Sequence, residues 1–334
     1  MSPLLICAIV AGIILVLIVL GVLLYFFALP KFILHKIRTS PNPDGEMTFP
    51  ENYDEMKSKC EIVKDLVYPS QYPSNAYNVY LPSKAEEKIP LIIWVHGGGF
   101  IGGTKDGGEN VMVALCSAGY AVASIDYAVA PEHKYPTAVR QVSEFVSNLP
   151  ELFKKYPVID ENKIIFGGDS AGAQIAAQYV TTQTNHGFAE EMHIPVLLNE
   201  KIKATVLICG PFNLPAIRTY AQKTNKMFRR LVDIWGRVYF GKLFWYKNAA
   251  ARQTVIAEHL TKDFPPTFLT DGNKGSFEAQ NRKLALSLKE LNVPVEEVYF
   301  DLEKGEVPHE FLFHLHEQNS LYCMEKILDF LHRI

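Results

Sequence analysis

The stretch GDSAG at positions 168–172 decides the fold of this chain, because it stands between an apolar run and a helical pattern. Residues 163–167 before it are typical of a buried strand, and residues 173–182 after it are typical of a helix. A serine on such a strand-to-helix turn lies on a tight, strained bend, and glycines on both sides leave room for the backbone. The pattern therefore predicts that the bend exposes the Ser170 hydroxyl.

A second glycine-rich turn, HGGGF at 96–100, directly follows the apolar run 91–95. The backbone N–H groups of Gly98 and Gly99, together with that of Ala171, are expected to point at one developing negative oxygen, as in an oxyanion hole. A glycine-rich turn that only caps a strand is the alternative interpretation. His96 is interpreted as a residue that braces this loop and not as a catalytic base.

The histidine that would activate Ser170 is expected late in the chain, because α/β-hydrolases order their triad as nucleophile, acid, histidine. His309 fits that order, since it lies in VPHEF at 307–311, after a predicted strand and before a final helix at 319–332. His314 and His316 are near enough to raise the question of a metal cluster. No cysteine or carboxylate stands at ligand spacing, so no metal site is predicted. Glu306 and Glu310 are expected to be solvated loop charges.

Together these blocks resemble the hormone-sensitive-lipase-like branch of the α/β-hydrolase esterases, which includes arylacetamide-deacetylase-like enzymes. The resemblance extends from about residue 60 to the C-terminus. It rests on HGGGF, on GDSAG, and on DYAVAPEH at 126–133 followed by YP at 135–136. In the third block Ala128 replaces the family's usual arginine and Val129 its leucine. The resemblance implies hydrolysis of carboxylic esters without a metal or organic cofactor.

The acid of the triad is the point where this chain departs from the family. The family carries Gly-x-x-Asp-Pro-Leu after its seventh strand, whereas this chain reads GNKGSF at 272–277, which puts Gly275 at the aspartate position. Asp271 ends the apolar run 266–270 and is predicted to be the acid, since strand ends of a parallel sheet face one crevice. Glu278 and Glu303 are alternative acids, and Asn213 is another polar group that could orient the base.

Strand-like and helical runs alternate along the chain, which predicts an α/β-hydrolase fold: a mostly parallel sheet with helices on both faces. An edge hairpin is expected at 60–68 and 77–81, and a helical cap is expected as an insertion at about 211–260. The hydrolase domain is predicted to span 60–334, and an apolar fraction of 48% suits a large core. The strands are expected at 91–95, 120–126, 163–167, 204–209, 266–271 and 295–301.

The N-terminal segment carries no charged side chain over the 26 positions 4–29, which exceeds the roughly 20 residues that cross a hydrocarbon core. A retained single-pass membrane anchor at 1–30 is predicted, followed by a juxtamembrane segment at 31–59. A secretory signal peptide is the alternative, but the segment lacks an early Lys or Arg and a small-residue cleavage site. Lys31, Lys36 and Arg38 follow it, which favours a cytoplasmic catalytic domain.

The expected cap region is basic and aromatic. In the related esterases such a region covers the active site, so its aromatic side chains could line an acyl pocket and its basic face could rest on anionic lipid. An ordinary amphipathic helix with a solvated basic face explains the same pattern. The basic residues are Arg218, Lys223, Lys226, Arg229, Arg230, Arg237, Lys242 and Lys247.

These observations predict a membrane-anchored serine carboxylesterase or lipase that acts on small-molecule or lipid esters of short to medium acyl chains. A catalytically weak relative that serves as a membrane-tethered binding protein is the alternative. A net charge of -3 gives no nucleic-acid signal, and five scattered cysteines suggest no disulfide framework. Whether the molecule forms a homodimer is left open.

Overall fold

The N-terminal unit is an apolar helical segment. The computed structural model describes residues 2–39, 47–85, 87–224 and 226–334 and divides into two compact units, Met1–Pro43 and Asp44–Ile334. In the first unit α1 (Pro3–Leu23) is followed by a π-helical stretch (Leu24–Ala28) and α2 (Leu29–Arg38). Within α1, residues 3–22 are long and apolar enough to cross a membrane, a property that membrane anchors and signal sequences share.

The second unit is built on one eight-stranded sheet with the order β1-β2-β4-β3-β5-β6-β7-β8. The first two strands form an antiparallel hairpin, β2 pairs antiparallel with β4, and every later pairing is parallel. The predicted mostly parallel sheet is thereby confirmed. The strands are β1 (Cys60–Val67), β2 (Ala76–Pro82), β3 (Ile89–Val95), β4 (Ala121–Ile125), β5 (Ile159–Asp169), β6 (Ile202–Ile208), β7 (Thr267–Thr270) and β8 (Val295–Val298).

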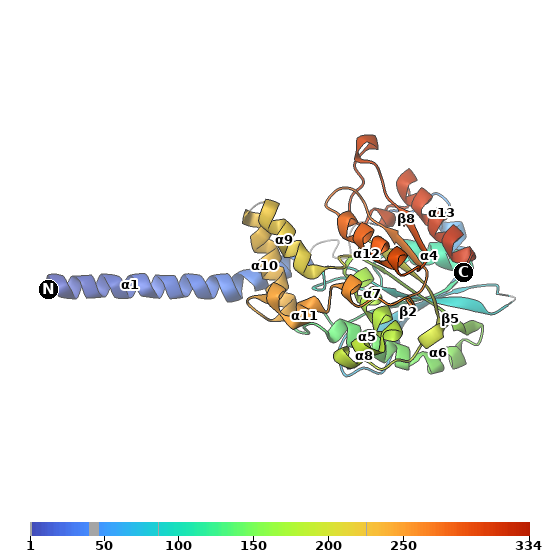
Figure 1. Cartoon of the computed structure of the whole chain (residues 1–334), viewed down its shortest axis with the longest axis horizontal. Helices are drawn as coiled ribbons and strands as arrows, with labels where there is room; N and C mark the ends of the chain where they lie inside the picture. The colour runs from blue at the N-terminus through green and yellow to red at the C-terminus, as the bar shows by residue number, and fades with distance from the viewer. Residues whose placement is uncertain (1, 40–46, 86, 225) are drawn as a thin grey trace. The chain divides into compact units, whose positions relative to one another are not determined.

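Helices flank this sheet (Figure 1), as expected for an α/β-hydrolase fold. The last strand is shorter than the predicted 295–301, because Phe300 turns away to pack edge-on against Phe311 with ring centroids 4.9 Å apart. The helices of the second unit are α3 (Tyr53–Ser58), α4 (Glu109–Ser117), α5 (Thr137–Ser147), α6 (Leu149–Lys155), α7 (Ser170–Thr184), α8 (His186–Met192), α9 (Leu214–Thr224), α10 (Lys226–Phe240), α11 (Ala249–Arg252), α12 (Glu278–Glu290) and α13 (Gln318–His332).

The centre of the sheet is packed so that it fixes the end of β5. Trp94 on β3 is fully buried and lies over Gly167 on β5, where an added Cβ would stand 2.5 Å from the indole ring. The indole N–H of Trp94 also donates to Asp169 Oδ1 at 3.0 Å. Gly167 thus leaves room for the Trp94 ring, which in turn holds Asp169, the residue before Ser170.

Two helices between β6 and β7 pack against each other. α9 and α10 are joined by an ion pair between Arg218 and Asp233. Gly236 of α10 allows close packing, since an added Cβ there would collide with the indole of Trp245. The pair therefore forms a helical hairpin joined by a charge pair, and Trp245 packs against its second helix.

Candidate active site

Ser170 lies at the turn between β5 and α7 with a φ of 48°, a conformation that non-glycine residues rarely adopt. An added Cβ on Gly172 would collide with the carbonyl oxygens of Val95 and His96, and one on Gly168 would stand 2.8 Å from the Val95 oxygen. The two glycines therefore let the strained turn pack directly against the end of β3. Residues held in such a conformation cluster at functional sites.

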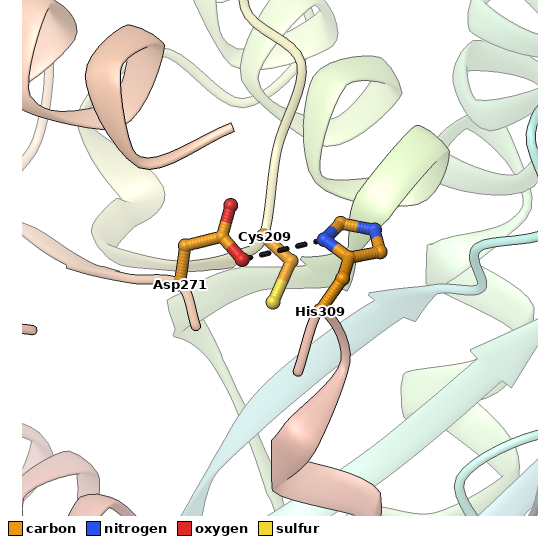
Figure 2. A group of neighbouring side chains, drawn as sticks. All are labelled: Cys209, Asp271 and His309. Carbon is orange, nitrogen blue, oxygen red and sulfur yellow. Dashed lines mark hydrogen bonds and ion pairs between the residues drawn. The ribbon is translucent and has the colours of Figure 1, made fainter. Parts of the chain in front are cut away.

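Three segments far apart in the sequence bring the predicted triad residues together. Ser170 Oγ lies 3.0 Å from His309 Nε2. His309 Nδ1 lies 3.3 Å from Asp271 Oδ1 (Figure 2). Ser170 comes from the start of α7, His309 from the loop after β8, and Asp271 from the end of β7. The serine hydroxyl, the imidazole and the carboxylate form one continuous chain of contacts, which is the geometry of a nucleophile, its base and an orienting acid.

Backbone amides hold the Asp271 carboxylate in place. The Gly272 N–H donates to Oδ1 at 2.8 Å, and the Phe277 N–H donates to Oδ2 at 2.7 Å. Asp271 is fully buried, so these donors replace the water that a carboxylate would otherwise bind. Gly275, the position at which the family carries its aspartate, has a φ of 65° and faces open space. The loop that contains Gly275 thus surrounds the carboxylate of Asp271, which lies four positions earlier.

The alternative acids lie elsewhere. Glu278 begins α12 and pairs with Arg282 at 2.7 Å, and Glu303 is exposed. Asn213 uses its side-chain oxygen to accept the Ala216 N–H at 3.0 Å, at the start of α9. Each of these side chains has a local structural task or faces solvent, which leaves Asp271 as the carboxylate beside His309.

Cys209 completes a buried group that sequence spacing did not reveal. Its thiol, one carboxylate oxygen of Asp271 and one ring nitrogen of His309 all lie within 4.8 Å of one another (Figure 2). Burial and the neighbouring Asp271 charge raise the pKa of the Cys209 thiol, so the sulfur keeps its proton and donates it to the carboxylate. The sulfur also accepts the Glu310 N–H at 3.3 Å. Such a set could bind a thiophilic cation, and sequence spacing did not reveal it because Cys209 and Asp271 lie far from His309 along the chain.

The other two histidines considered for a metal cluster are engaged elsewhere. Thr48 forms a hydrogen bond to His316 and a β-bridge to His314. The segment around residue 48 is thereby fastened to the C-terminal part of the unit.

Glu310 is not the solvated loop charge that the sequence suggested. It is half-buried, has a φ of 60°, and makes a side-chain hydrogen bond to Ser170. It also faces Asp169, and the two carboxyl groups approach the same backbone position, where an added Cβ on Gly97 would meet both. Burial raises the pKa of both carboxyl groups. The charge of Glu310 adds to burial at Asp169, and the charge of Asp271 adds to burial at Glu310.

His309 is a stronger base than an ordinary histidine. Burial lowers its pKa, but the hydrogen bond and charge of Asp271, followed by the charges of Glu310 and Asp169, outweigh burial and raise the pKa. A raised pKa favours transfer of the Ser170 proton to the imidazole, because the resulting imidazolium is stabilised.

The glycine-rich loop packs beside the same site, since an added Cβ on Gly97 would meet the carboxyl groups of Asp169 and Glu310. Gly98 and Gly99 have φ values of 101° and 61°, and Ala171 belongs to the first turn of α7, where amides lack partners within the helix. The indole N–H of Trp235 on α10 donates to the Gly99 carbonyl at 2.7 Å, and Tyr239 stacks on Phe100 with centroids 4.2 Å apart. α10 therefore covers the loop through Trp235 and Tyr239; the sequence predicted a cap in this region but not these particular contacts.

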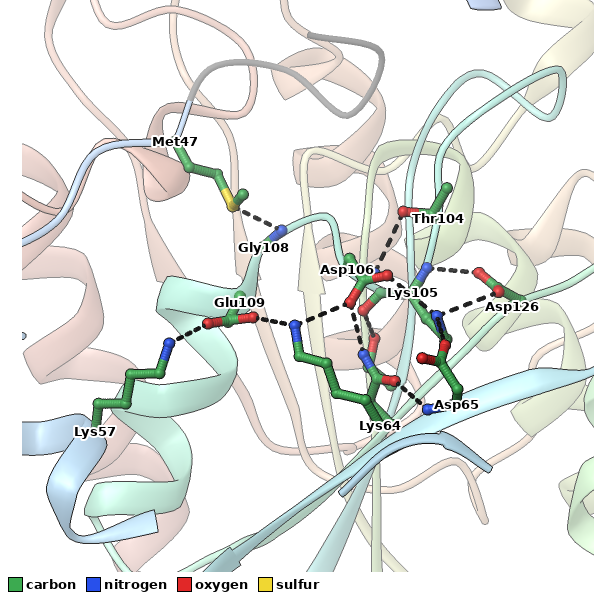
Figure 3. Close-up of polar contacts among 12 residues, drawn as sticks. Met47, Lys57, Lys64, Asp65, Thr104, Lys105, Asp106, Gly108, Glu109 and Asp126 are labelled. Atoms are coloured by element: carbon green, nitrogen blue, oxygen red, sulfur yellow. Dashed lines mark hydrogen bonds and ion pairs between the residues drawn. The ribbon is translucent and has the colours of Figure 1, made fainter. Parts of the chain in front are cut away.

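A polar network fixes the far end of this loop (Figure 3). The Lys105 N–H donates to Asp126 at 2.6 Å, and its ammonium group contacts Asp65 at 2.8 Å and Asp106 at 3.1 Å. Burial lowers the pKa of His96 to about 4, so the ring is neutral, and it stacks on Tyr127 with centroids 4.2 Å apart. These contacts fit the interpretation of His96 as a bracing residue.

Comparison with known proteins finds a matching family model and relatives named as an esterase and as a formamidase. A model of the BD-FAE family matches residues 77–287. The acetyl esterase of Salmonella schwarzengrund is 25% identical over 236 residues, which cover 68% of each chain. The kynurenine formamidase of Danio rerio is 28% identical over 173 residues, 51% of this chain and 54% of that relative. The crystal structure of esterase B from Lactobacillus rhamnosis has a TM-score of 0.73 at 19% identity, covering 92% of this chain and 96% of its own, which shows the shared α/β-hydrolase fold.

Proposed function

Since the chain belongs to the BD-FAE family and is a carboxylic ester hydrolase, we propose that Ser170, His309 and Asp271 are its catalytic triad. The observation that carries this proposal is the 3.0 Å contact between Ser170 Oγ and His309 Nε2, with Asp271 on the other ring nitrogen. We further propose the hormone-sensitive-lipase-like branch, on the strength of its three sequence blocks.

The proposed reaction is a two-step acyl transfer. Ser170 Oγ attacks the ester carbonyl carbon while its proton passes to His309 Nε2, and the imidazolium then protonates the leaving alkoxide as the C–O bond breaks. Water, deprotonated by the same imidazole, attacks the acyl-enzyme and releases the carboxylic acid. Asp271 holds the ring so that Nε2 faces Ser170. As the acyl-enzyme C–O bond breaks, the imidazolium passes the proton taken from water to Ser170 Oγ. The original Ser170 proton has left with the alcohol, so no external acid or base is consumed.

The N–H groups of Gly98, Gly99 and Ala171 are proposed to bind the negative oxygen of each tetrahedral intermediate. Backbone amides need no reorganisation as charge develops, and each such donor contributes roughly 100- to 1,000-fold in rate. Trp235 and Tyr239 support this role, because they hold the glycine loop from above.

Short- to medium-chain acyl esters are the proposed substrates. The aromatic roof over the glycine loop favours compact, uncharged acyl groups, and one relative is named an acetyl esterase. A series of p-nitrophenyl esters from acetate to palmitate would separate an esterase from a lipase. We expect kcat/KM to be highest for acyl chains of about eight carbons or fewer. A maximum at palmitate would contradict this substrate class.

The decisive test replaces the nucleophile. Ser170→Ala is expected to lower kcat on p-nitrophenyl acetate by about a millionfold, as triad removal does in other serine hydrolases. Ser117→Ala, which removes a hydroxyl at the end of α4, is the matched control and should keep full activity. A fluorophosphonate should label the parent chain and the control only. Full activity in folded Ser170→Ala would overturn the triad, and an unlabelled, inactive parent would favour the binding-protein alternative.

We also propose that α1 is a retained single-pass anchor with the hydrolase unit on the cytoplasmic side. Its apolar run exceeds the length that a bilayer requires, and Lys31, Lys36 and Arg38 follow it. The full chain should stay in the membrane pellet at alkaline pH and be digested by protease added to the cytoplasmic face. Release of a chain shortened at its N-terminus would instead identify a signal sequence.

A further inference from the structure

The end of the helical hairpin where α9 leads into α10 exposes large apolar side chains. Tyr220 is 64% exposed, Met227 72%, Phe228 37% and Leu231 43%. The rings of Tyr220 and Phe228 meet edge-to-face with centroids 6.4 Å apart, so the contributions of the two helices form one surface. We call these four residues the cap tip. Single exposed apolar residues are ordinary, whereas such a cluster marks a surface that contacts something else.

Positive charge surrounds the cap tip. Lys223, Lys226 and Arg230 are exposed on the same two helices. The stretch 216–247 contains eight basic residues and one acidic residue, Asp233, which pairs with Arg218. Aromatic and aliphatic side chains flanked by Lys and Arg are the composition of helices that lie in the interface of an anionic membrane.

A lipid surface fits this pattern better than a second copy of the chain. In a symmetric dimer the same surface would meet itself, and like charges from both copies would repel. Anionic headgroups are complementary to these cations. Only the residues 39–43 separate α2 from the second unit, so an anchor in the bilayer would keep the cap tip at a high effective concentration of lipid.

We propose that the cap tip docks into the surface of an anionic lipid bilayer. Docking itself is independent of the catalytic mechanism, whereas its consequence for substrate choice rests on the proposed function. α10 carries the docking residues at its start and Trp235, which contacts the glycine loop, further along. Docking would bring the roof of the active site to the lipid surface, which favours amphipathic esters that reside in the membrane over freely soluble ones.

The expected strength of docking follows from the charges. Each Lys or Arg near an anionic surface contributes about fivefold in partitioning, or ~1 kcal/mol. Replacing both Lys226 and Arg230 with Glu should therefore weaken docking by roughly 25-fold or more. High salt should weaken it in the parent chain, because the Debye length falls to about 3 Å at 1 M.

The test uses the full chain in phosphatidylserine-containing vesicles, with a fluorophore on Met227→Cys and a lipid-borne quencher. Leu302→Cys, which lies in an exposed turn after β8, is the matched control site. Cys7→Ser and Cys60→Ser remove the native thiols that are not buried. We expect strong quenching at position 227 and little at 302. Equal quenching at both positions, or none at 227, would overturn the proposal.

Further variants and lipid compositions distinguish lipid docking from dimer formation and test the role of charge. Lys226→Glu with Arg230→Glu, or vesicles of phosphatidylcholine alone, should reduce quenching at position 227, and undiminished quenching would contradict the role of charge. Crosslinking between two copies through position 227 without lipid quenching would assign the surface to a dimer and overturn lipid docking. Ser170→Ala should dock like the parent chain, so a failed triad and a failed docking surface give different results.

Discussion

The end of β5 and the end of β7 supply the nucleophile and the acid, and they are built in different ways. At β5 five consecutive residues suffice, because Gly168 and Gly172 let the strained Ser170 turn pack on β3. At β7 the Asp271 carboxylate is held by amides of the following loop and by the thiol of Cys209 from β6's end. A nucleophile turn is therefore encoded by neighbouring residues. The acid can occupy a different sequence position, because segments distant in the sequence hold its carboxylate in place.

Removing the acid should have the largest effect within this comparison. Asp271→Asn is expected to lower kcat/KM by about 10⁴-fold, because the amide cannot stabilise the imidazolium and favours the wrong tautomer of His309. Measurement of p-nitrophenyl acetate hydrolysis checks this, with the thermal melting temperature as a test of folding.

The matched controls for this prediction are the alternative acids. Glu278→Gln and Glu303→Gln should each keep kcat/KM within a factor of about three, since surface substitutions away from a site change little. A collapse of activity in either control, together with an active Asp271→Asn enzyme, would reassign the acid and remove the contrast between the two strand ends.

Crowding the nucleophile turn should have the second largest effect. Gly172→Ala puts a methyl group against the Val95 and His96 carbonyls, so α7 must shift and carry the Ser170 hydroxyl with it. A misplacement of about 1 Å costs about 100-fold in rate, which is the expected loss in kcat. Gly187→Ala in α8 is the control, because its Cβ would meet only the Asn185 side chain, at 3.5 Å. An unchanged kcat for Gly172→Ala would show that the turn is looser than its packing implies.

Features encoded by neighbouring residues could be predicted from the sequence, whereas those held by distant segments could not. The strands β3 and β5 and the Ser170 turn were predictable, because apolar runs and glycines at fixed spacing indicate local backbone geometry. The half-buried position of Glu310 was not predicted. Its backbone adopts a left-handed φ, and a glutamate in the sequence gives no indication of that conformation. Cys209 was missed because it reads as one more apolar position at the end of β6.

A cap over the site was expected at about 211–260 from the family resemblance, but its particular contact with the glycine loop was not. The segment 211–260 could be recognised as basic and aromatic, yet nothing in it indicated that Trp235 would reach the Gly99 carbonyl. Such a contact depends on the packing angle of α10, which long-range contacts decide. The roles of Ser170, His309 and Asp271 stay predictions until the variants above are measured, whereas the α/β-hydrolase fold is confirmed.

The pH dependence of catalysis tests the state of His309, the base that contacts both Ser170 after β5 and Asp271 after β7. kcat/KM should fall about tenfold per pH unit below the pKa of His309, because the imidazolium cannot accept the Ser170 proton. The charge of Glu310 helps to raise that pKa, so Glu310→Gln should move the acid limb to lower pH. The groups that face Glu310 are His309, Asp271, Asp169 and Tyr127.

Glu306→Gln is the control for this shift, since Glu306 is exposed and pairs with Lys274. Its acid limb should coincide with that of the parent chain. An acid limb that does not move in Glu310→Gln would contradict this prediction and mean that the Glu310 carboxyl is neutral beside His309.

The smallest expected effect concerns the thiol behind the acid. Cys209→Ala removes one donor to Asp271 and one acceptor for the Glu310 N–H, each worth about 1 kcal/mol. A loss of roughly five- to tenfold in kcat/KM is expected. EDTA should leave the parent chain's activity unchanged, because the proposed mechanism uses these three side chains without a cation. Loss of activity on chelation, restored by Zn²⁺ in the parent chain but not in Cys209→Ala, would make Cys209 a metal ligand and the end of β7 a metal site in place of a triad acid.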